Sequence, residues 1–284
     1  MPPQIAARPA ERFLNANLKW RVITASVGIP VLLLAVYGGL PWVSAVALIA
    51  AGAASLELMR MAGGAGLRRY AIAFPALALT AAGVSVSGMG ADSGAATAPA
   101  VFAGAAAALG IASAVTSHPR SGGKSYIVAG AAVYFGALLA HAPMLAAHEN
   151  GRDWLFIAIL GTFAVDSAAY FTGRAVGRRK LAPKISPKKT WEGAVGGLIA
   201  GPVAVIGLNS LIGPGIPTWH AGAVGLAVAI SGTLGDLAES ALKRAVGVKD
   251  SGAVIPGHGG ILDRIDSLAP GIATVYWLAV WSAM

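Results

Sequence analysis

The sequence predicts an all-α polytopic membrane protein with about nine transmembrane helices, the N-terminus in the cytoplasm and the C-terminus outside. Apolar residues of the AVILMFWYC set make up 56% of the 284 positions, charged residues make up 12%, and the mean hydropathy is +0.69. Soluble domains carry about 25% charged residues. In addition, apolar stretches of about 20 residues, long enough to cross a bilayer, recur along the chain.

We expect spans at 22–40, 42–59, 70–90, 97–116, 126–146, 154–173, 191–212, 219–241 and 265–283. Gly, Ala and Ser dilute the third and fourth of these, and Pro75 and Pro99 interrupt or cap them. Residues 1–18 are polar and of mixed charge, so we expect no cleavable signal peptide. The first span then serves as the insertion signal.

The positive charges test this count of spans. With the N-terminus inside and the spans alternating, the inside segments contain all of the 21 Lys and Arg residues except Arg152. This agrees with the positive-inside rule, and a wrong number of spans would scatter the charges over both sides. The net charge of +9 follows mostly from this topology and from attraction to anionic lipid headgroups, so we expect no nucleic-acid partner. The absence of cysteine excludes disulfides and thiolate metal sites.

Charge is concentrated in one stretch near the C-terminus. Five of the 12 Asp and Glu residues lie between Gly235 and Asp266, interleaved with basic residues and a loop rich in Gly and Pro. Acids can hold a divalent cation, bases can hold phosphate, and a glycine-rich backbone can bring N–H groups to an anion. The stretch therefore indicates phosphoryl or nucleotidyl transfer. A solvated charged loop is the alternative, but it needs no run such as Pro256 to Gly260 directly before two aspartates.

Part of this stretch falls within the eighth predicted span. Asp236, Glu239, Ser240 and Lys243 are spaced i, i+3, i+4 and i+7, so on a helix they form one polar stripe. A carboxylate in a membrane helix costs about 2.5–3.5 kcal/mol on insertion scales, so such residues usually have a function. Residues near a helix end can also simply reach the interface, an alternative that suits Glu239 and Ser240 better than Asp236.

Two further acids open the last predicted span. On a helix Asp263 and Asp266 share a face, and Gly259 and Gly260 leave the chain free to place N–H groups near an anion. Acids at a helix start are also favoured by the helix dipole, which is the structural alternative. Asp236 on the neighbouring helix favours a metal site, because two carboxylates from two helices can hold an ion between them.

A third constellation spans the end of the sixth predicted helix and the loop after it. Asp166 lies near the cytoplasmic end of that helix, and seven basic residues follow between Arg174 and Lys189. Ser186 and Thr190 add hydroxyl groups, and the prolines of the loop indicate a turn. Positive-inside charge alone explains 174–180 better than it explains 186–193.

The stretch from Ser240 to Asp266 resembles the signature of the CDP-diacylglycerol synthases, or phosphatidate cytidylyltransferases. Every fixed position of that pattern is filled, by Ser240, Lys243, Arg244, Lys249, Asp250, Gly252, Pro256, Gly257, His258, Gly259, Gly260, Asp263, Arg264 and Asp266. Residues 166–193 resemble the same family, but Ala168 stands where the family pattern has Gly. This replacement leaves open how closely the helices pack at that point. The likeness is strong from about residue 160 to 270 and general over 1–150, where it includes Glu57.

The resemblance implies transfer of the cytidylyl group of CTP to phosphatidate, giving CDP-diacylglycerol and pyrophosphate for phospholipid biosynthesis, at the cytoplasmic face of the cell membrane. It implies Mg²⁺ on Asp236 and Asp263, and leaves open the number of ions and whether a monovalent cation joins them. It implies catalytic roles for Asp236, Lys243, Lys249, Asp250, Asp263, Arg264 and Asp266. It implies substrate binding by Asp166, Ser186, Lys188, Lys189, Thr190, Ser240, Arg244, His258, Gly259 and Gly260. His258 is either a general base or a ring that orders the loop.

We therefore expect two regions, the N-terminal spans in 1–150 and a catalytic region in 151–284 with a basic loop at 174–190 and the signature at 240–266. The resemblance also implies membrane lipids as partners and a homodimer. Two alternatives remain. A CTP-dependent lipid or polyprenol kinase would release CDP and matches the pattern less well. A transporter should carry acids near the midplane in both halves, whereas here the acids crowd the second half.

Overall fold

A computed structural model describes residues 23–24, 26–62, 68–88, 124–252 and 259–282. The chain is almost entirely helical over these residues, as predicted. The helices are Ser26–Tyr37, α2 (Leu40–Ala62), α3 (Arg68–Ser87), α5 (Lys124–Ala147), α6 (Gly151–Val176), α7 (Trp191–Ile212), α8 (Thr218–Val246), α9 (Leu262–Ile265) and α10 (Leu268–Ser282). The predicted fourth span, 97–116, lies outside the described residues.

Five of the described helices are long and apolar enough to cross a membrane: Leu40–Met61, Ile127–Ala147, Gly151–Val176, Trp191–Ile212 and Thr218–Val246. Each coincides with a predicted span. The helix Ser26–Tyr37 and the segment Pro75–Ser87 are apolar but shorter, and α10 has 15 residues. The helical class with several candidate membrane-spanning helices is therefore confirmed, whereas nine spans and the orientation of the termini stay predictions.

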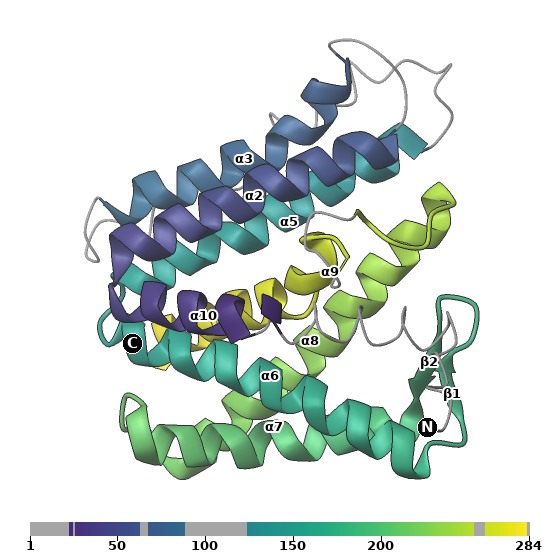
Figure 1. Ribbon diagram of the computed structural model, residues 1–284. Coiled ribbons are helices and arrows are strands. Elements are labelled where there is room, and N and C mark those ends of the chain that lie inside the picture. Colours follow the sequence, from purple (N-terminus) through teal and green to yellow (C-terminus); the bar gives the residue numbers. More distant parts are fainter. Residues whose placement is uncertain (1–22, 25, 63–67, 89–123, 253–258, 283–284) are drawn as a thin grey trace, which may run out of the picture.

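The helices form two groups that α10 joins (Figure 1). Helices α2, α3 and α5 pack against one another, α6 and α8 pack against α7, and α10 contacts α5, α6 and α8. Small residues allow close approach within each group. A Cβ on Gly201 of α7 would collide with the Gly225 carbonyl of α8, and a Cβ on Gly136 of α5 would lie 2.7 Å from Ala76 of α3. Both apolar cores contain residues from either side of position 150, so the two predicted regions pack as one body.

A two-stranded sheet follows α6, which an all-α prediction did not include. Strand β1 (Lys180–Ala182) pairs antiparallel with β2 (Ser186–Thr190), with Lys180 opposite Thr190 and Ala182 opposite Ser186. The turn lies before the run 186–193 and not within it: between the strands, the Ile185 N–H donates to the Ala182 carbonyl (3.1 Å) across Pro183. Pro187 instead lies within β2, a position that a two-stranded sheet tolerates because each strand has a free edge.

The last predicted span begins with an interruption. Helix α9 ends at Ile265, and α10 starts at Leu268 after a turn at Asp266 and Ser267. Pro270 has no N–H, so the Asp266 carbonyl lacks the donor that a continuous helix would supply. Gly235 of α8 packs so closely that a Cβ there would collide with this carbonyl. The interruption places short α9 against the C-terminal half of α8, where the polar residues gather.

Candidate active site

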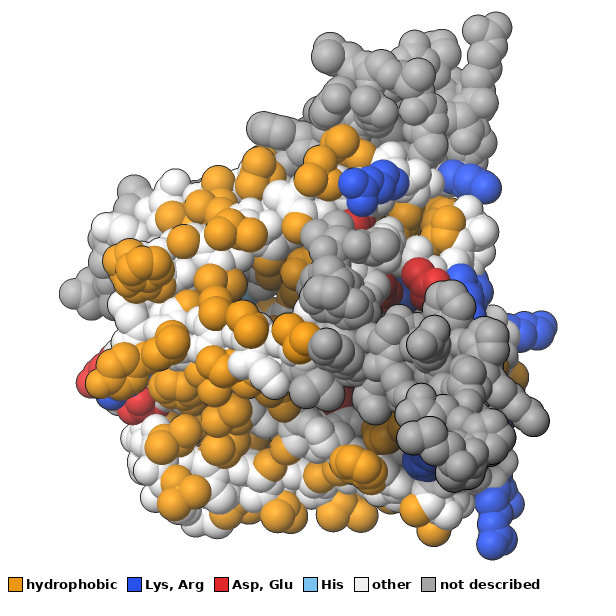
Figure 2. Space-filling model, viewed as in Figure 1, with side chains coloured by type: hydrophobic (Ala, Val, Ile, Leu, Met, Phe, Trp, Pro, Cys, Tyr) orange, Lys and Arg blue, Asp and Glu red, His pale blue; other side chains and the backbone are white. Residues whose placement is uncertain are grey.

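The predicted polar residues lie where α8, α9, the end of α6 and the β-hairpin approach one another. Figure 2 shows Lys and Arg side chains gathered along one edge of the molecule. Figure 1 places the hairpin and the C-terminal end of α8 at this same edge. The opposite edge shows little positive charge in this view.

The polar stripe on α8 is confirmed. The helix is continuous through the stripe, and Gly247 ends it with a left-handed backbone (φ 81°). The Ser240 hydroxyl lies 3.4 Å from Asp236 Oδ1, and Lys243 Nζ lies 2.5 Å from Glu239 Oε2. Glu239 is 1% exposed, and among the described residues its carboxylate has this ionic contact but no directional hydrogen bond. Glu239 is therefore buried beside Lys243 and does not reach out from a helix end.

Lys243 connects the stripe to Asp263 of α9. Its Nζ lies 2.5 Å from Asp263 Oδ1 as well as from Glu239. Asp263 Oδ2 accepts hydrogen bonds from the Ser251 hydroxyl (2.9 Å) and the Gly260 N–H (3.0 Å). Burial opposes ionisation of Asp263, but the Lys243 ammonium and the Gly260 N–H outweigh it and hold the pKa of Asp263 below its ordinary value. Asp263 is thus a fixed carboxylate that positions the Lys243 ammonium.

A second cluster surrounds Asp236. Lys189 from strand β2 places Nζ 2.7 Å from Asp236 Oδ2, so the hairpin contacts α8 at this point. Asp166 of α6 accepts a hydrogen bond from the Ser267 hydroxyl (2.8 Å). Asp266 interacts electrostatically with both Asp236 and Asp166. The acids predicted on three separate elements are therefore brought together.

The two clusters adjoin, because Glu239 interacts electrostatically with both Asp263 and Asp266. Together they contain five carboxyl groups and three cationic side chains. The acids are Asp166, Asp236, Glu239, Asp263 and Asp266, and the cations are Lys189, Lys243 and Arg264. This excess of acid is the chemistry that a divalent cation would balance.

The pairing of Asp236 with Asp263 around a metal ion stays a prediction. Among the described residues, no group of three or more His, Cys, Asp or Glu residues has a metal-binding arrangement. Asp236 and Asp263 are each in contact with a lysine instead. The side chain of Asp236 is 32% exposed, so a ligand can reach it.

Glu57 is a site residue that the sequence analysis noted but gave no role. It lies in α2, is fully buried, and accepts three hydrogen bonds from residues about 200 positions later in the chain. The Ile261 N–H donates to Oε1 (2.8 Å), and the Leu262 N–H (3.0 Å) and the Ser251 hydroxyl (3.1 Å) donate to Oε2. The N–H groups at the start of α9, expected to bind a ligand anion, thus bind a carboxylate of the protein.

Two glycines of the signature make room for Glu57. A Cβ on Gly252 would lie 2.8 Å from Glu57 Oε1. A Cβ on Gly260 would collide with the Ser251 hydroxyl and lie 2.5 Å from Glu57 Oε2. The sequence did carry a signal for Glu57, since it is the single acid in the apolar segment 42–59.

Several of the remaining predicted residues have local structural roles. Thr190 caps α7, where its hydroxyl accepts from the Gly193 N–H (3.2 Å), and Arg244 donates to the Val248 carbonyl (3.1 Å). Gly259 has a left-handed backbone (φ 83°) beside Asp263. Lys188, Lys249 and Asp250 are exposed, Ser186 is half-buried, and His258 lies outside the described residues. Their roles stay predictions.

The question that Ala168 left open was whether its methyl group disturbs close helix packing. The closest packing of α6 on α7 does not involve this residue. A Cβ on Gly197 of α7 would lie 3.2 Å from Val165 and 3.4 Å from Ala169, which are one turn apart on α6. The close approach of the two helices is therefore supplied by glycine on α7. The additional methyl group at Ala168 is accommodated.

Comparison with known proteins extends the resemblance to both halves of the chain. A sequence model described as the cytidylyltransferase family matches residues 19–281. A phosphatidate cytidylyltransferase of Haemophilus influenzae is 52% identical over 123 residues, 42% of either chain. Those of Brucella suis and Mycobacterium bovis are 48% identical over 126 residues (43% of this chain, 46% of the relative) and 37% identical over 146 residues (51% and 45%). The matches thus span a little under half the length of these curated relatives. Because the family model covers nearly the whole sequence, the chain belongs to the cytidylyltransferase family.

Proposed function

We propose that the protein is a phosphatidate cytidylyltransferase, which converts CTP and phosphatidate to CDP-diacylglycerol and pyrophosphate. The observation that carries this proposal is the acid-rich cluster of α8 and α9, in which Lys189 and Lys243 contact Asp236 and Asp263. These four residues occupy positions of the family pattern, at one end of apolar helices. The names of the similar bacterial proteins support the same reaction.

In the proposed reaction an oxygen of the phosphatidate phosphate attacks the α-phosphorus of CTP. A new P–O bond forms there as the bond to the β-phosphate oxygen breaks, and pyrophosphate leaves with the bonding electrons. The attacking phosphate is already anionic at neutral pH, so no strong base is needed. Alignment of the two phosphates and neutralisation of the developing charge are the contributions expected from the protein.

The described residues can supply both contributions. Asp263 holds the Lys243 ammonium and Asp236 holds that of Lys189, and in the proposed reaction these two cations bind the phosphates. Arg264 adds a third cation next to Asp263 in sequence. The excess of carboxyl groups fits Mg²⁺, which Asp236 and Asp263 would hold. When bound, Mg²⁺ neutralises triphosphate charge. The number of metal ions, and whether a monovalent cation joins them, are left open. Proposed nucleotide contacts outside the clusters are Ser186, Lys188, Arg244, Lys249, Asp250 and His258.

We further propose nine spans, a cytoplasmic N-terminus and an active site facing the cytoplasm from the cell membrane. The edge of the molecule that carries Lys and Arg supports this orientation (Figure 2), because basic residues concentrate on the cytoplasmic side. CTP would reach the cluster from the cytosol while the acyl chains of phosphatidate stay in the bilayer. A homodimer is part of the same proposal and rests on the family alone.

The test uses the purified protein in detergent with phosphatidate, Mg²⁺ and CTP that carries ³²P at either the α- or the γ-position. Cytidylyl transfer moves the α-label into lipid and releases the γ-label as pyrophosphate. A kinase moves the γ-label into lipid and leaves the α-label in CDP, and that result would overturn the proposal in favour of the alternative. Label in neither lipid product would exclude both reactions for phosphatidate.

A further inference from the structure

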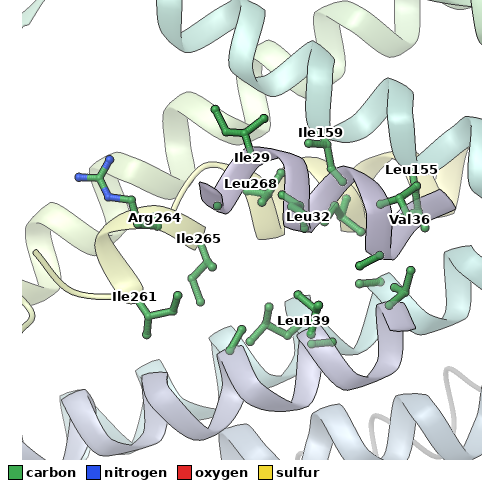
Figure 3. A pocket seen from close by; sticks show the side chains of 18 of the residues that line it. Ile29, Leu32, Val36, Leu139, Leu155, Ile159, Ile261, Arg264, Ile265 and Leu268 are labelled. Atoms are coloured by element: carbon green, nitrogen blue, oxygen red, sulfur yellow. The ribbon is translucent and has the colours of Figure 1, made fainter. Parts of the chain in front are cut away.

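A cavity of about 380 Å³ opens between the helix Ser26–Tyr37, α2, α5, α6 and the α9–α10 segment. Figure 3 shows that the labelled side chains around it are apolar, with the exception of one arginine. Leu32, Leu139, Ile159, Ile265 and Leu268 border the space, each from a different helix. An apolar cavity of this kind takes an apolar ligand group.

Arg264 stands at one end of the cavity and is the one charged residue among the described residues that line it. In Figure 3 its guanidinium points away from the apolar interior, beyond Ile261 and Ile265. Arg264 also follows Asp263 directly in α9 and interacts electrostatically with Asp166. The cavity therefore begins at the candidate active site and leads away from it between the helices.

The length of the cavity can be taken from α6, which lines it with one residue per turn. Leu155, Ile159 and Phe163 cover eight residue steps, or about 12 Å along a helix. The hydrocarbon core of a bilayer is about 30 Å thick, so one leaflet contributes about 15 Å. The apolar space is thus nearly as long as one leaflet is deep, and its charged end lies at the edge where the candidate active site lies.

We propose that this cavity binds one acyl chain of the lipid substrate and that Arg264 contacts the lipid phosphate. The identity of the lipid as phosphatidate rests on the proposed function. The combination of an apolar channel with a cation at one end matches a phosphate attached to a hydrocarbon chain. CTP or free phosphate could use the cation but not the apolar length.

The same geometry makes the cavity a determinant of which acyl-chain lengths the protein prefers in its lipid substrate. Small residues on α2, including Ala47 and Ala50, leave space between it and the facing helices. A leucine at either position would fill part of the cavity and exclude the distal methylene groups of a long chain. A short chain would not reach the filled part. Substitution should therefore change the preference between substrates and leave the affinity for CTP unaltered.

The experiment compares Ala47→Leu and Ala50→Leu with wild type and with Ala45→Leu, an exposed position on the same helix. The ratio of kcat/KM for dioleoyl phosphatidate to that for dioctanoyl phosphatidate is measured at saturating CTP. The ratio should fall about tenfold in the cavity variants, as expected when about two methylene groups lose their burial. It should not change in Ala45→Leu. Equal loss for both lipids, or no loss in Ala50→Leu, which is only half-buried, would overturn the proposal.

A binding measurement separates failure of the cavity from failure of the proposed function. Phosphatidate with a spin label near the end of one acyl chain is added to the purified protein, and its immobilised fraction is measured. We expect an immobilised component in wild type that decreases in the cavity variants. If the protein transfers no cytidylyl group but shows this pattern, the proposed activity fails and the cavity assignment stands. If the immobilised fraction is equal in wild type and both cavity variants, the cavity assignment fails whatever the activity.

Discussion

Glu57→Gln tests whether one buried carboxylate holds the signature segment against α2. The substitution keeps the size of the side chain but replaces one acceptor oxygen with an NH₂ group. In one orientation the NH₂ group faces the Ile261 N–H, and in the other it faces the Leu262 N–H. Either way a buried backbone donor loses its acceptor, which costs about 1–3 kcal/mol. The remaining bonds also lose a charged acceptor, so we expect a total loss of about 2–4 kcal/mol.

The assay is thermal unfolding of the purified protein in one detergent, with Glu149→Gln as the control. Glu149 is exposed in the turn before α6, so its substitution should have little effect. A loss of 2–4 kcal/mol corresponds to a decrease in Tm of about 5–15 °C for a chain of this size. If Glu57→Gln unfolds within about 2 °C of Glu149→Gln, the reasoning about these hydrogen bonds is refuted.

A double-mutant cycle assigns the effect to the contact itself. The single proton of the Ser251 hydroxyl is shared between Glu57 (3.1 Å) and Asp263 (2.9 Å), so Ser251→Ala removes one of the three contacts to Glu57. Residues in one hydrogen-bond network show coupling of about 0.5–3 kcal/mol. We expect coupling of that size between Glu57→Gln and Ser251→Ala. Strict additivity would contradict the shared network.

The other predictions concern the glycine contact, the cap of α7 and the lysine of β2. Gly260→Ala should abolish activity and lower Tm, because its Cβ would collide with the Ser251 hydroxyl. The control Gly207→Ala should do neither, because no atom lies within 4 Å of its new Cβ. Equal Tm values for the two variants would contradict this. Thr190→Val should cost about 1 kcal/mol in unfolding measurements through loss of the cap, and Thr190→Ser should restore it. Lys189→Met should lower kcat/KM for CTP about 100-fold, as expected from losing one charge contact in the transition state. Its Tm should change little because the pair with Asp236 is partly exposed, so a large loss of Tm with unchanged kinetics would argue for a purely structural role.

Local spacing explains why part of the site could be predicted. The i, i+3, i+4 and i+7 positions of a helix share a face regardless of what surrounds it, and Asp236 to Lys243 behaves as this rule requires. The basic segment after α6 was likewise recognisable, although the contact of Lys189 with Asp236 joins distant residues and was not predicted. Both features depend on residues close in sequence.

Features that depend on distant contacts could not be predicted in the same way. No pattern in the sequence pairs Glu57 with the N–H groups of Ile261 and Leu262, because the pairing results from how α2 packs beside α9. The apolar cavity arises in the same manner from residues on five segments, each of which alone reads as an ordinary span. The break before α10 was different, because Pro270 was a signal for it in the sequence. The prediction missed the break because the span was assigned from apolar content alone.

The central claim is that the cluster of α8 and α9 carries out cytidylyl transfer, and one comparison tests it most directly. Incorporation of α-³²P from CTP into phosphatidate is measured with Mg²⁺ for wild type, Asp236→Asn, Asp263→Asn and Asp153→Asn, the last at the opposite end of α6 from Asp166. We expect transfer by wild type and Asp153→Asn, and a loss of at least about 100-fold in the two cluster variants, as is typical when a transition-state charge contact is removed. Transfer at the wild-type rate by folded Asp236→Asn or Asp263→Asn would contradict the claim.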